Sequence, residues 1–332
     1  MRIAFLGLGT WGFALAHLLA SKGYNVTSWT TKPQLAEHIN SKREHPNLQG
    51  FMAPPTLSAT TDMQEALSKA EIIIEAVTSA GVRPVFRQVK ELKPPHCPII
   101  MTSKGIEQDS GLILPDVVIE ILGEEARNKV GILSGPSFAQ EVIRGLPVSV
   151  VGAAYDFDAM MQVCEAFTTS TFRVYPNSDV QGVAYGGALK NIIAIACGVA
   201  EGLSLGYSCA AALMTRGLHE IRKLAIARGC KGETLNGLSG MGDICLTCTA
   251  PISRNFRYGY LLAQGLTPEA ALKEIGMVVE GTYTCVSALQ LSKQLQVAMP
   301  ITEMVYKIVY LSMPPQYAVD LLMQRSVKQE HL

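Results

Sequence analysis

The segment YGGALKNIIAIACGVAEG, residues 185–202, places Lys190 and Asn191 among small and aliphatic residues. Moving an ammonium group out of water is unfavourable, and unpaired lysines are rarely fully buried. Lys190 must therefore either point outward or carry out a function. Burial would lower its pKa from ~10.4 toward neutrality, where a lysine is an efficient general acid.

A second motif with chemical meaning is GLGTWG, in which Gly7, Gly9 and Gly12 directly follow the predicted strand RIAFL. The first glycine permits a tight turn, the second lets the backbone approach a pyrophosphate, and the third lets helix and strand pack closely. The helix that follows presents its N-terminus to the phosphate charge. The pattern predicts dinucleotide binding, and a purely structural glycine turn is the alternative.

The end of the second predicted strand, NVTSW, bears on the choice of cofactor. An enzyme selective for NAD usually has an acidic residue there, about 20 residues after the glycines, to bind the ribose. This chain instead has Thr30, Thr31 and Lys32. Two hydroxyls and one positive charge predict that NADPH is at least tolerated, unless Lys32 is an ordinary solvated residue.

Other polar residues follow later predicted strands, where open α/β sheets bind their ligands. PIIMTSKGIE places Lys104 at such a strand end, and ILSGPSFAQEV places Gly135, Ser137 and Ala139 at another. Ser137 could equally be the N-cap of the next helix, with Glu141 near the position of a capping partner.

Composition limits the class of protein. The chain has 332 residues, 48% of them hydrophobic, and a formal net charge of zero. It has no basic run to neutralise a phosphate polymer or an anionic membrane surface, so we expect a small-molecule partner, with no nucleic acid and no membrane. Eight scattered cysteines suit reduced thiols in the cytoplasm, and the lone CxxC of Cys245 and Cys248 lacks a second pair for zinc.

Neither apolar stretch of the chain is expected to be a targeting or membrane segment. The first twenty residues are hydrophobic behind Arg2, but glycines interrupt the apolar core that a signal peptide requires. The run 192–200 is far shorter than the ~20 residues that cross a bilayer.

The elements that must position these residues fall into two halves. Up to about residue 178, short β-branched runs alternate with amphipathic helical stretches, which is typical of βαβ units and a mostly parallel sheet. From about residue 180 the periodicity is helical. We predict a Rossmann-type doubly wound α/β domain over residues 1–179 and an all-α substrate-binding domain over residues 180–332.

Seven motifs together closely resemble the NAD(P)-dependent glycerol-3-phosphate dehydrogenase family in its bacterial form. Three lie in the helical half, GGALKN, LSGMGDICLTC and PISRNFRYG, and the others are GLGTWG, TSKGIE, LSGPSFA and VVEGTYT. The motifs occur in the right order over essentially the whole chain. The resemblance implies an oxidoreductase that reduces dihydroxyacetone phosphate reversibly to glycerol 3-phosphate with NADPH or NADH, for phospholipid synthesis. A homodimer is compatible with the alanine- and glycine-rich helices, as is a monomeric core.

The resemblance also implies the site residues. The cofactor-binding set is Gly7, Gly9, Thr10, Trp11, Gly12, Thr31, Lys32, Lys104, Ala139, Arg254, Val278 and Glu280. The substrate-binding set is Lys104, Gly135, Ser137, Lys190, Asn191, Asp243, Thr247, Ser253, Arg254 and Asn255. Lys190, Lys104 and Asp243 are the predicted catalytic residues. Where the family usually has asparagine and often arginine after LSLG, this chain has Ser208 and Ala210, so a role for those positions does not carry over.

The implied roles follow from the reaction. Negative charge grows on the ketone oxygen as hydride arrives, so a cationic proton donor at Lys190 stabilises the transition state. Asp243 is predicted to orient Lys190, or alternatively to cap nearby backbone, and Lys104 to polarise the substrate. Ser253, Arg254 and Asn255 offer a hydroxyl, a guanidinium and an amide to the phosphate at a helix start.

Two other functions fit parts of the pattern. A 3-hydroxyacid dehydrogenase of similar architecture also uses a lysine on a helical domain, but it acts on carboxylate substrates. A nucleotide sensor would keep the fold without catalysis, although it would have no need for Lys104, Lys190, Asp243 and Arg254 together.

Overall fold

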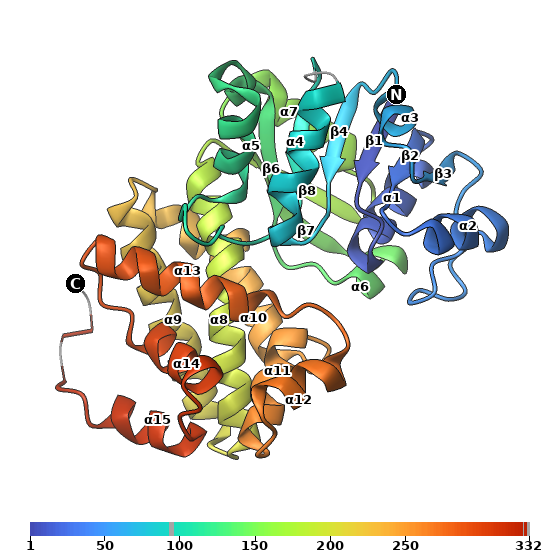
Figure 1. The fold of residues 1–332 in the computed structure, drawn as a ribbon. Helices are drawn as coiled ribbons and strands as arrows, with labels where there is room; N and C mark the ends of the chain where they lie inside the picture. The colour runs from blue at the N-terminus through green and yellow to red at the C-terminus, as the bar shows by residue number, and fades with distance from the viewer. Residues whose placement is uncertain (93–95, 328, 331–332) are drawn as a thin grey trace. The chain divides into compact units, whose positions relative to one another are not determined.

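The computed structural model describes residues 1–92, 96–327 and 329–330 (Figure 1). The chain forms two compact units. The first comprises residues 1–107, 112–187 and 233–243, and the second comprises residues 108–111, 188–232 and 244–332. The expected boundary after residue 179 stays a prediction, and residues 328, 331 and 332 of the second predicted domain lie outside the described part.

The first unit contains an eight-stranded sheet in the order β3-β2-β1-β4-β5-β6-β7-β8. Neighbouring strands are parallel, except that β6 and β7 are antiparallel. The strands are β1 (Arg2–Leu6), β2 (Asn25–Trp29), β3 (Leu57–Thr60), β4 (Ile72–Glu75), β5 (Ile99–Met101), β6 (Val130–Ser134), β7 (Val148–Ala154) and β8 (Phe172–Asn177).

Helices connect these strands, as the alternating pattern predicts. They are α1 (Thr10–Ser21), α2 (Pro33–Lys42), α3 (Met63–Leu67), α4 (Val82–Leu92), α5 (Leu114–Leu122), α6 (Ala139–Ile143) and α7 (Phe157–Phe167). Shorter turns of helix are η1 (Ser79–Gly81), η2 (Glu124–Lys129), η3 (Gly232–Asn236) and the π-helical η4 (Leu238–Gly242). The predicted doubly wound fold is confirmed, because the strand order reverses direction between β1 and β4.

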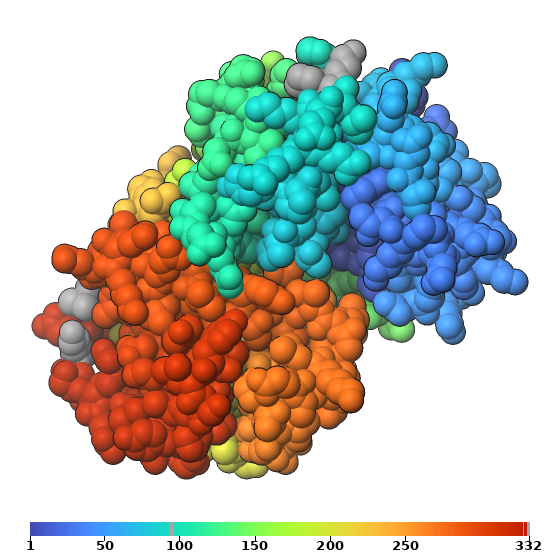
Figure 2. All heavy atoms as spheres, in the orientation of Figure 1, coloured from blue at the N-terminus to red at the C-terminus, as the bar shows by residue number. Residues whose placement is uncertain are grey.

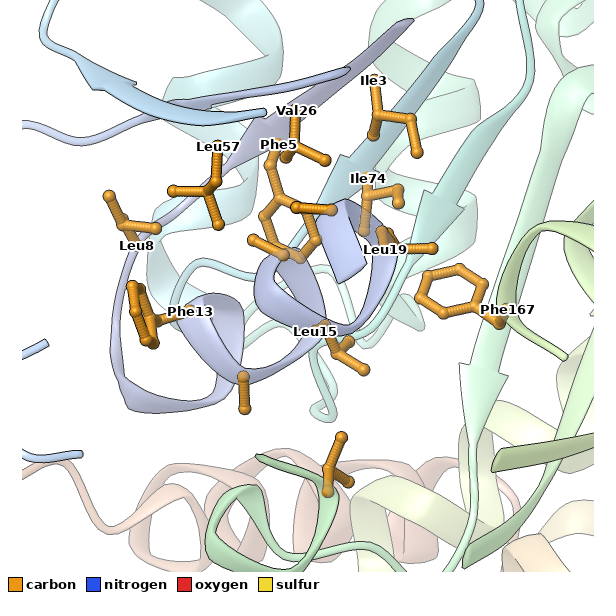
Figure 3. Close-up of a cluster of buried hydrophobic side chains, with 14 of the residues drawn as sticks. Ile3, Phe5, Leu8, Phe13, Leu15, Leu19, Val26, Leu57, Ile74 and Phe167 are labelled. Carbon is orange, nitrogen blue, oxygen red and sulfur yellow. The ribbon is translucent and has the colours of Figure 1, made fainter. Parts of the chain in front are cut away.

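Side chains alternate across the strands, and the sheet buries both of its faces. Ile3 and Phe5 of β1 belong to one hydrophobic cluster with Leu15 and Leu19 of α1 and Phe167 of α7 (Figure 3). Ala4 and Leu6, which point to the opposite face, are equally buried. Coverage of both faces is what holds the carboxyl ends of the central strands in fixed positions.

The helix α8 (Val180–Gly202) starts in the first unit and ends in the second. The other helices of the second unit are α9 (Gly206–Ala227), α10 (Asp243–Thr249), α11 (Arg254–Ala263), α12 (Pro268–Ile275), α13 (Glu280–Gln294), α14 (Pro300–Tyr310) and α15 (Pro315–Met323). The later helices form most of this unit's surface in Figure 2, where little of α8 is visible.

The expectation that residues 192–200 are not a membrane segment rested on the shortness of that run, but the helix that contains the run is longer. The whole helix has 23 residues and is apolar enough to cross a membrane by length and composition. Its apolar window is, however, 94% buried inside the protein. This helix is a core element, because its small and aliphatic side chains are covered by neighbouring helices.

Glycines bring α8 and α11 into close contact within the second unit. A Cβ on Gly198 would lie 1.9 Å from the carbonyl oxygen of Phe256, and one on Gly259 would lie 2.0 Å from that of Ile195. No side chain fits at either position. This contact packs α11 against the C-terminal half of α8.

The sequence pattern missed four of the described helices, α3, α7, α10 and α15. α7, with the sequence FDAMMQVCEAF, follows the strand β7. Asp156 caps it, because the Asp156 carboxylate accepts from the Ala159 amide. α15 begins at a Pro-Pro step, which ends the preceding segment and pre-sets the first helical turn. Both signals are local and short, whereas helical periodicity is clear only over longer segments.

Candidate active site

The glycine turn between β1 and α1 is built as predicted. Gly7 has φ 107°, and a Cβ there would lie 2.6 Å from the Ala76 carbonyl oxygen. A Cβ on Gly12 would lie 2.1 Å from the Gly7 carbonyl oxygen. By contrast, nothing lies within 4 Å of a Cβ placed on Gly9. The first and third glycines are required by packing, and the second leaves open space at the helix start.

That open space suits a dinucleotide. Gly9 is the N-cap residue of α1, and no side chain caps the first turn in the described structure. The first amides of a helix have no intrahelical partner and attract anions. Thr10 and Trp11, which begin α1, are partly exposed, and the Thr10 hydroxyl accepts a hydrogen bond from Asn47 Nδ2 (3.1 Å). A pyrophosphate fits this turn.

The carboxyl end of β2 presents the residues expected to distinguish the two nicotinamide cofactors. Thr30 is buried, and its hydroxyl accepts from the Lys32 amide at 3.3 Å. Thr31 and Lys32 are exposed, and Lys32 is the N-cap residue of α2. Hydroxyl and ammonium groups at this point are compatible with a 2′-phosphate.

A group of predicted substrate residues meets within the first unit. Lys104 Nζ donates to Asp243 Oδ2 at 2.6 Å and to the Gly135 carbonyl oxygen at 3.1 Å. Asp243 is fully buried, and Lys104 keeps 17% of its side chain exposed. The pair is therefore a partly desolvated ion pair in which the lysine has a third donor hydrogen for a ligand.

Two glycines of GGALKN explain how this group is assembled. A Cβ on Gly187 would lie 2.5 Å from Ser134 Oγ and 3.5 Å from Lys104 Cδ, and one on Gly186 would lie 2.6 Å from the Ser239 carbonyl oxygen. The start of α8 thus makes room for Lys104 and for η4, the π-turn that ends at Asp243. Asp243 is the first residue of the helix α10 in this arrangement.

The structure corrects one alternative for Ser137. The N-cap residue of α6 is Phe138, without a side-chain cap, so Ser137 does not cap this helix. Its hydroxyl donates instead to the Gly135 carbonyl oxygen at 3.1 Å, the oxygen that also accepts from Lys104. Ala139, the first residue of α6, is partly exposed.

Lys190 is buried with 7% exposure, so the alternative of an outward-pointing lysine is wrong. Its Nζ donates to Thr247 Oγ1 at 2.7 Å, and the hydroxyl is itself buried on α10. Thr247 lies four residues after Asp243 on this helix, one turn along the same face. The predicted pairing of Asp243 with Lys190 stays a prediction.

The adjacent Asn191 joins three helices of the second unit. Asn255 Nδ2 donates to Asn191 Oδ1 at 3.0 Å, and Asn255 Oδ1 accepts from the Gly281 amide at 2.9 Å. Ser253 caps α11, because its hydroxyl oxygen accepts from the Phe256 amide at 3.3 Å. These contacts use one amide hydrogen of Asn255 and leave its second one for a ligand.

Arg254 lies exposed at the N-terminus of α11. Its Nη1 donates to the Val278 carbonyl oxygen at 2.8 Å, just before Glu280 starts α13. Arg254, Val278 and Glu280 are thus gathered at one place in the second unit. Thr31 and Lys32 are at the end of β2, away from the Lys104 group in the strand order.

The CxxC residues lie on α10. Cys248 is buried, and a hydrogen bond with Cys197, together with burial, holds the pKa of its thiol well above the usual range. A metal ligand must be a thiolate, which this environment disfavours. Among the described residues no group of three or more His, Cys, Asp or Glu side chains is arranged to hold a metal.

Sequence reasoning missed a buried carboxyl beside the glycine turn. Glu75 ends β4 with no exposed surface, accepts a hydrogen bond from the Val77 amide and is in hydrogen-bond contact with the Ser103 hydroxyl. A glutamate at the tip of the buried strand IIIE was a signal, because charged residues almost never occur there without partners.

A glycine turn on a doubly wound, mostly parallel sheet, together with a buried lysine on a later helix, is the construction of a nicotinamide-dependent dehydrogenase. Residues 2–160 match the family described as NAD-dependent glycerol-3-phosphate dehydrogenase N-terminus, and residues 179–320 match the corresponding C-terminus. The chain belongs to the NAD-dependent glycerol-3-phosphate dehydrogenase family.

Individual relatives cover the whole chain. It is 63% identical to the glycerol-3-phosphate dehydrogenase [NAD(P)+] of Protochlamydia amoebophila, over 100% of this chain and 99% of the relative. The Chlamydia pneumoniae enzyme of the same name is 52% identical over 99% of both chains. The crystal structure of glycerol-3-phosphate dehydrogenase from Coxiella burnetii is 36% identical, with a TM-score of 0.93 over 98% of this chain and 99% of that one.

Proposed function

We propose that this chain reduces dihydroxyacetone phosphate with Lys190 as the proton donor and Arg254 as a phosphate ligand. It is an NAD(P)-dependent glycerol-3-phosphate dehydrogenase and uses NADH or NADPH. The bound nicotinamide supplies a hydride to C2 of the ketone. The observation that carries the proposed role of Lys190 is its burial, with 7% exposure, in hydrogen-bond contact with a buried hydroxyl.

Lys190 donates its proton to the ketone oxygen as negative charge develops there. The Thr247 hydroxyl orients the ammonium by accepting one of its hydrogens at 2.7 Å. A donor held in place before the reaction stabilises the transition state more than the ground state. In the reverse reaction the neutral amine accepts the hydroxyl proton.

Lys104 and Asp243 act as a pair. Asp243, fully buried, holds the Lys104 ammonium at 2.6 Å, and the Gly135 carbonyl oxygen accepts a second hydrogen. Both acceptors fix the amine so that its third hydrogen contacts the substrate. Ser137 shares the Gly135 carbonyl oxygen and presents its hydroxyl oxygen at the same strand end.

The phosphate of the substrate is bound at the start of α11. This helix has ten residues, and its exposed Arg254 supplies a guanidinium at the first turn, where Ser253 caps the Phe256 amide. Ser253 and Asn255 are buried next to it and hold the turn through their own hydrogen bonds. Together they make a fixed anion site.

A direct assay tests the proposed function. Initial rates of absorbance loss at the reduced-nicotinamide band are measured with dihydroxyacetone phosphate and each reduced cofactor, and with oxidised cofactor and 3-hydroxyisobutyrate. We expect turnover with the phosphorylated ketone and none with the hydroxyacid. Cofactor binding without turnover of either substrate would contradict the proposal and indicate a sensor.

We further propose a cytoplasmic homodimer that supplies phospholipid synthesis and has no nucleic acid or membrane partner. Zero net charge supports the absence of a phosphate-polymer partner. The outward face of α9, which includes Tyr207 at 92% exposure, offers apolar surface for a second copy. Analytical ultracentrifugation at micromolar concentration tests the dimer, and a monomer mass there would exclude it.

A further inference from the structure

Glu75 is a buried carboxyl at the centre of the sheet. It is the last residue of β4 and has no exposed surface. In the sheet it pairs with Leu6 of β1 on one side and Met101 of β5 on the other. The carboxyl end of this strand lies at the reversal of strand order, where the glycine turn begins. An unpartnered carboxyl there would be strongly unfavourable, so its contacts determine its role.

Its contacts join two loops. Glu75 Oε1 accepts from the Val77 amide at 2.7 Å and lies 2.6 Å from Ser103 Oγ. Oε2 lies 3.4 Å from the Ser103 amide. Ser103 Oγ is also in short contact with the Val77 carbonyl oxygen. One carboxyl group therefore connects the loop after β4 with the loop after β5.

The number of protons in this cluster indicates its ionisation state. Ser103 Oγ has one hydrogen, yet it contacts two oxygens that accept hydrogen bonds, Glu75 Oε1 and the Val77 carbonyl oxygen. If Glu75 is ionised, one of these contacts has no hydrogen. If Glu75 is protonated, it donates to Ser103 Oγ, which in turn donates to Val77. Burial supports the second state, because it raises the pKa of Glu75 to about 7.

Both loops belong to the cofactor and substrate machinery of the first unit. A Cβ on Gly7 would lie 2.8 Å from the Val77 amide nitrogen, so the peptide that Glu75 holds packs directly against the glycine turn. Ser103 immediately precedes Lys104. A Cβ on Gly105 would lie 2.7 Å from the Ser79 Cβ, so the two loops also touch beyond the carboxyl.

Charged groups on the neighbouring strands are engaged elsewhere. β1 carries Arg2 at its opposite end, where its amide and guanidinium contact Glu71. The residues of β5 are all apolar, and Lys104 just beyond it pairs with Asp243. Glu75 forms no ion pair with Arg2 or Lys104. Its contacts with Val77 and Ser103 are hydrogen bonds.

We propose that Glu75, held as a neutral carboxylic acid, is a positioning residue that fastens the peptide beneath the glycine turn to the loop that carries Lys104. Its effect on the reaction passes through the backbone of Val77 and through Ser103. The inference rests on the proposed roles of the glycine turn and Lys104. Cofactor affinity is therefore the primary measurement, because it does not depend on turnover of the ketone.

The test compares E75Q, E75L and the surface control E71Q. Binding of NADPH without substrate is measured by fluorescence between pH 6 and 8.5. At pH 6 we expect E75Q and E71Q to bind like the wild type, because an amide also donates and accepts, and E75L to bind about tenfold more weakly. Wild-type affinity should fall as pH rises through about 7, where Glu75 loses its proton, and E75Q should not follow.

Infrared difference spectra give a readout that is independent of binding. Wild type minus E75Q at pH 6 should show the carbonyl band of a protonated carboxylic acid, and the band should disappear at high pH. Absence of the band at pH 6, or equal pH dependence of NADPH affinity in wild type and E75Q, overturns the proposal. If E75L does not fold, these two comparisons still decide it. Tight NADPH binding without ketone turnover would instead refute the proposed function alone.

Discussion

At the scale of single residues, the site depends on where ammonium groups are held. The buried Lys190 ammonium donates to the Thr247 hydroxyl, and the partly buried Lys104 ammonium donates to the Asp243 carboxylate. We propose Lys190 as the proton donor and Lys104 as the cation that polarises the substrate.

Replacing Lys190 by methionine tests the proton donor. The side chain keeps its length and loses its proton, so we expect kcat to fall by about 10²–10⁴-fold with little change in NADPH affinity. The exposed Lys273 on α12, changed to methionine, is the control. Stopped-flow rates of NADPH oxidation measure the effect, and a kcat within threefold of the wild type would remove Lys190 from the mechanism.

Replacing Thr247 by valine tests the orienting hydroxyl. Valine has nearly the same shape but cannot accept from Lys190, so the ammonium loses a fixed direction and is buried with one fewer partner. We expect kcat to fall by about tenfold or more and the pH profile of kcat to shift to lower pH, because the protonated amine is less stable. An unshifted profile would leave Thr247 with a packing role only.

Replacing Arg254 by alanine tests the phosphate ligand. Loss of the guanidinium should raise KM for dihydroxyacetone phosphate strongly, by about tenfold or more, with a smaller effect on kcat. Arg257, exposed one turn later on the same helix, provides the matched control R257A. Equal KM values for R254A and R257A would refute the assignment.

At the scale of secondary-structure elements, strand ends and helix starts create the site. The carboxyl ends of β1, β2, β4, β5 and β6 all lead into loops that carry predicted or newly found residues. In the second unit, the start of α11 carries predicted site residues, and close glycine contacts pack this helix against α8. Small residues at these crossings therefore serve function through packing.

The end of β2 and the start of α2 should set cofactor preference. Changing Lys32 to glutamate places a negative charge at the position expected near a 2′-phosphate, so KM for NADPH should rise about tenfold or more relative to KM for NADH. Lys42, exposed at the other end of α2, gives the control K42E. An unchanged ratio of the two KM values would show that Lys32 is simply solvated.

At the scale of the whole molecule, stability should depend on pH through buried carboxyls. Glu220, on α9, accepts from the Ile301 amide at 2.6 Å and from Thr302, at the start of α14. Burial is the main cause that raises its pKa to about 7. Glu75 has a raised pKa for the same reason. Both carboxyls retain protons in the folded chain that the unfolded chain releases.

The sign of this effect follows from proton binding. Between the ordinary glutamate pKa and about 7 the folded state binds more protons, so the free energy of unfolding falls as pH rises across that range. The contribution of Glu220 is about 3 kcal/mol at most. Urea unfolding at pH 5 and pH 8 should show this loss, and E220Q should show a smaller one. An equal loss in E220Q would contradict the role of Glu220.

Local sequence information determined much of the architecture. The GxGxxG turn, the alternation of strands with helices and the change to helical periodicity near residue 180 are patterns over a few neighbouring residues, and they predicted the doubly wound sheet correctly. The same information predicted that Lys104 and Ser137 lie at strand ends. Helix ends and the short helices α7 and α15 were harder to predict from the sequence. They depend on capping and packing contacts that involve only a few residues.

Contacts between distant residues were decided only by the tertiary structure. Lys104 and Asp243 are 139 positions apart, and Lys190 and Thr247 are 57 apart. No periodicity in the sequence records which polar groups meet, because sheet order and helix crossings bring them together and desolvate them. The sequence therefore determined which chemical groups are available, whereas the fold determined their partners, their burial and, for Glu75, the protonated state that we infer.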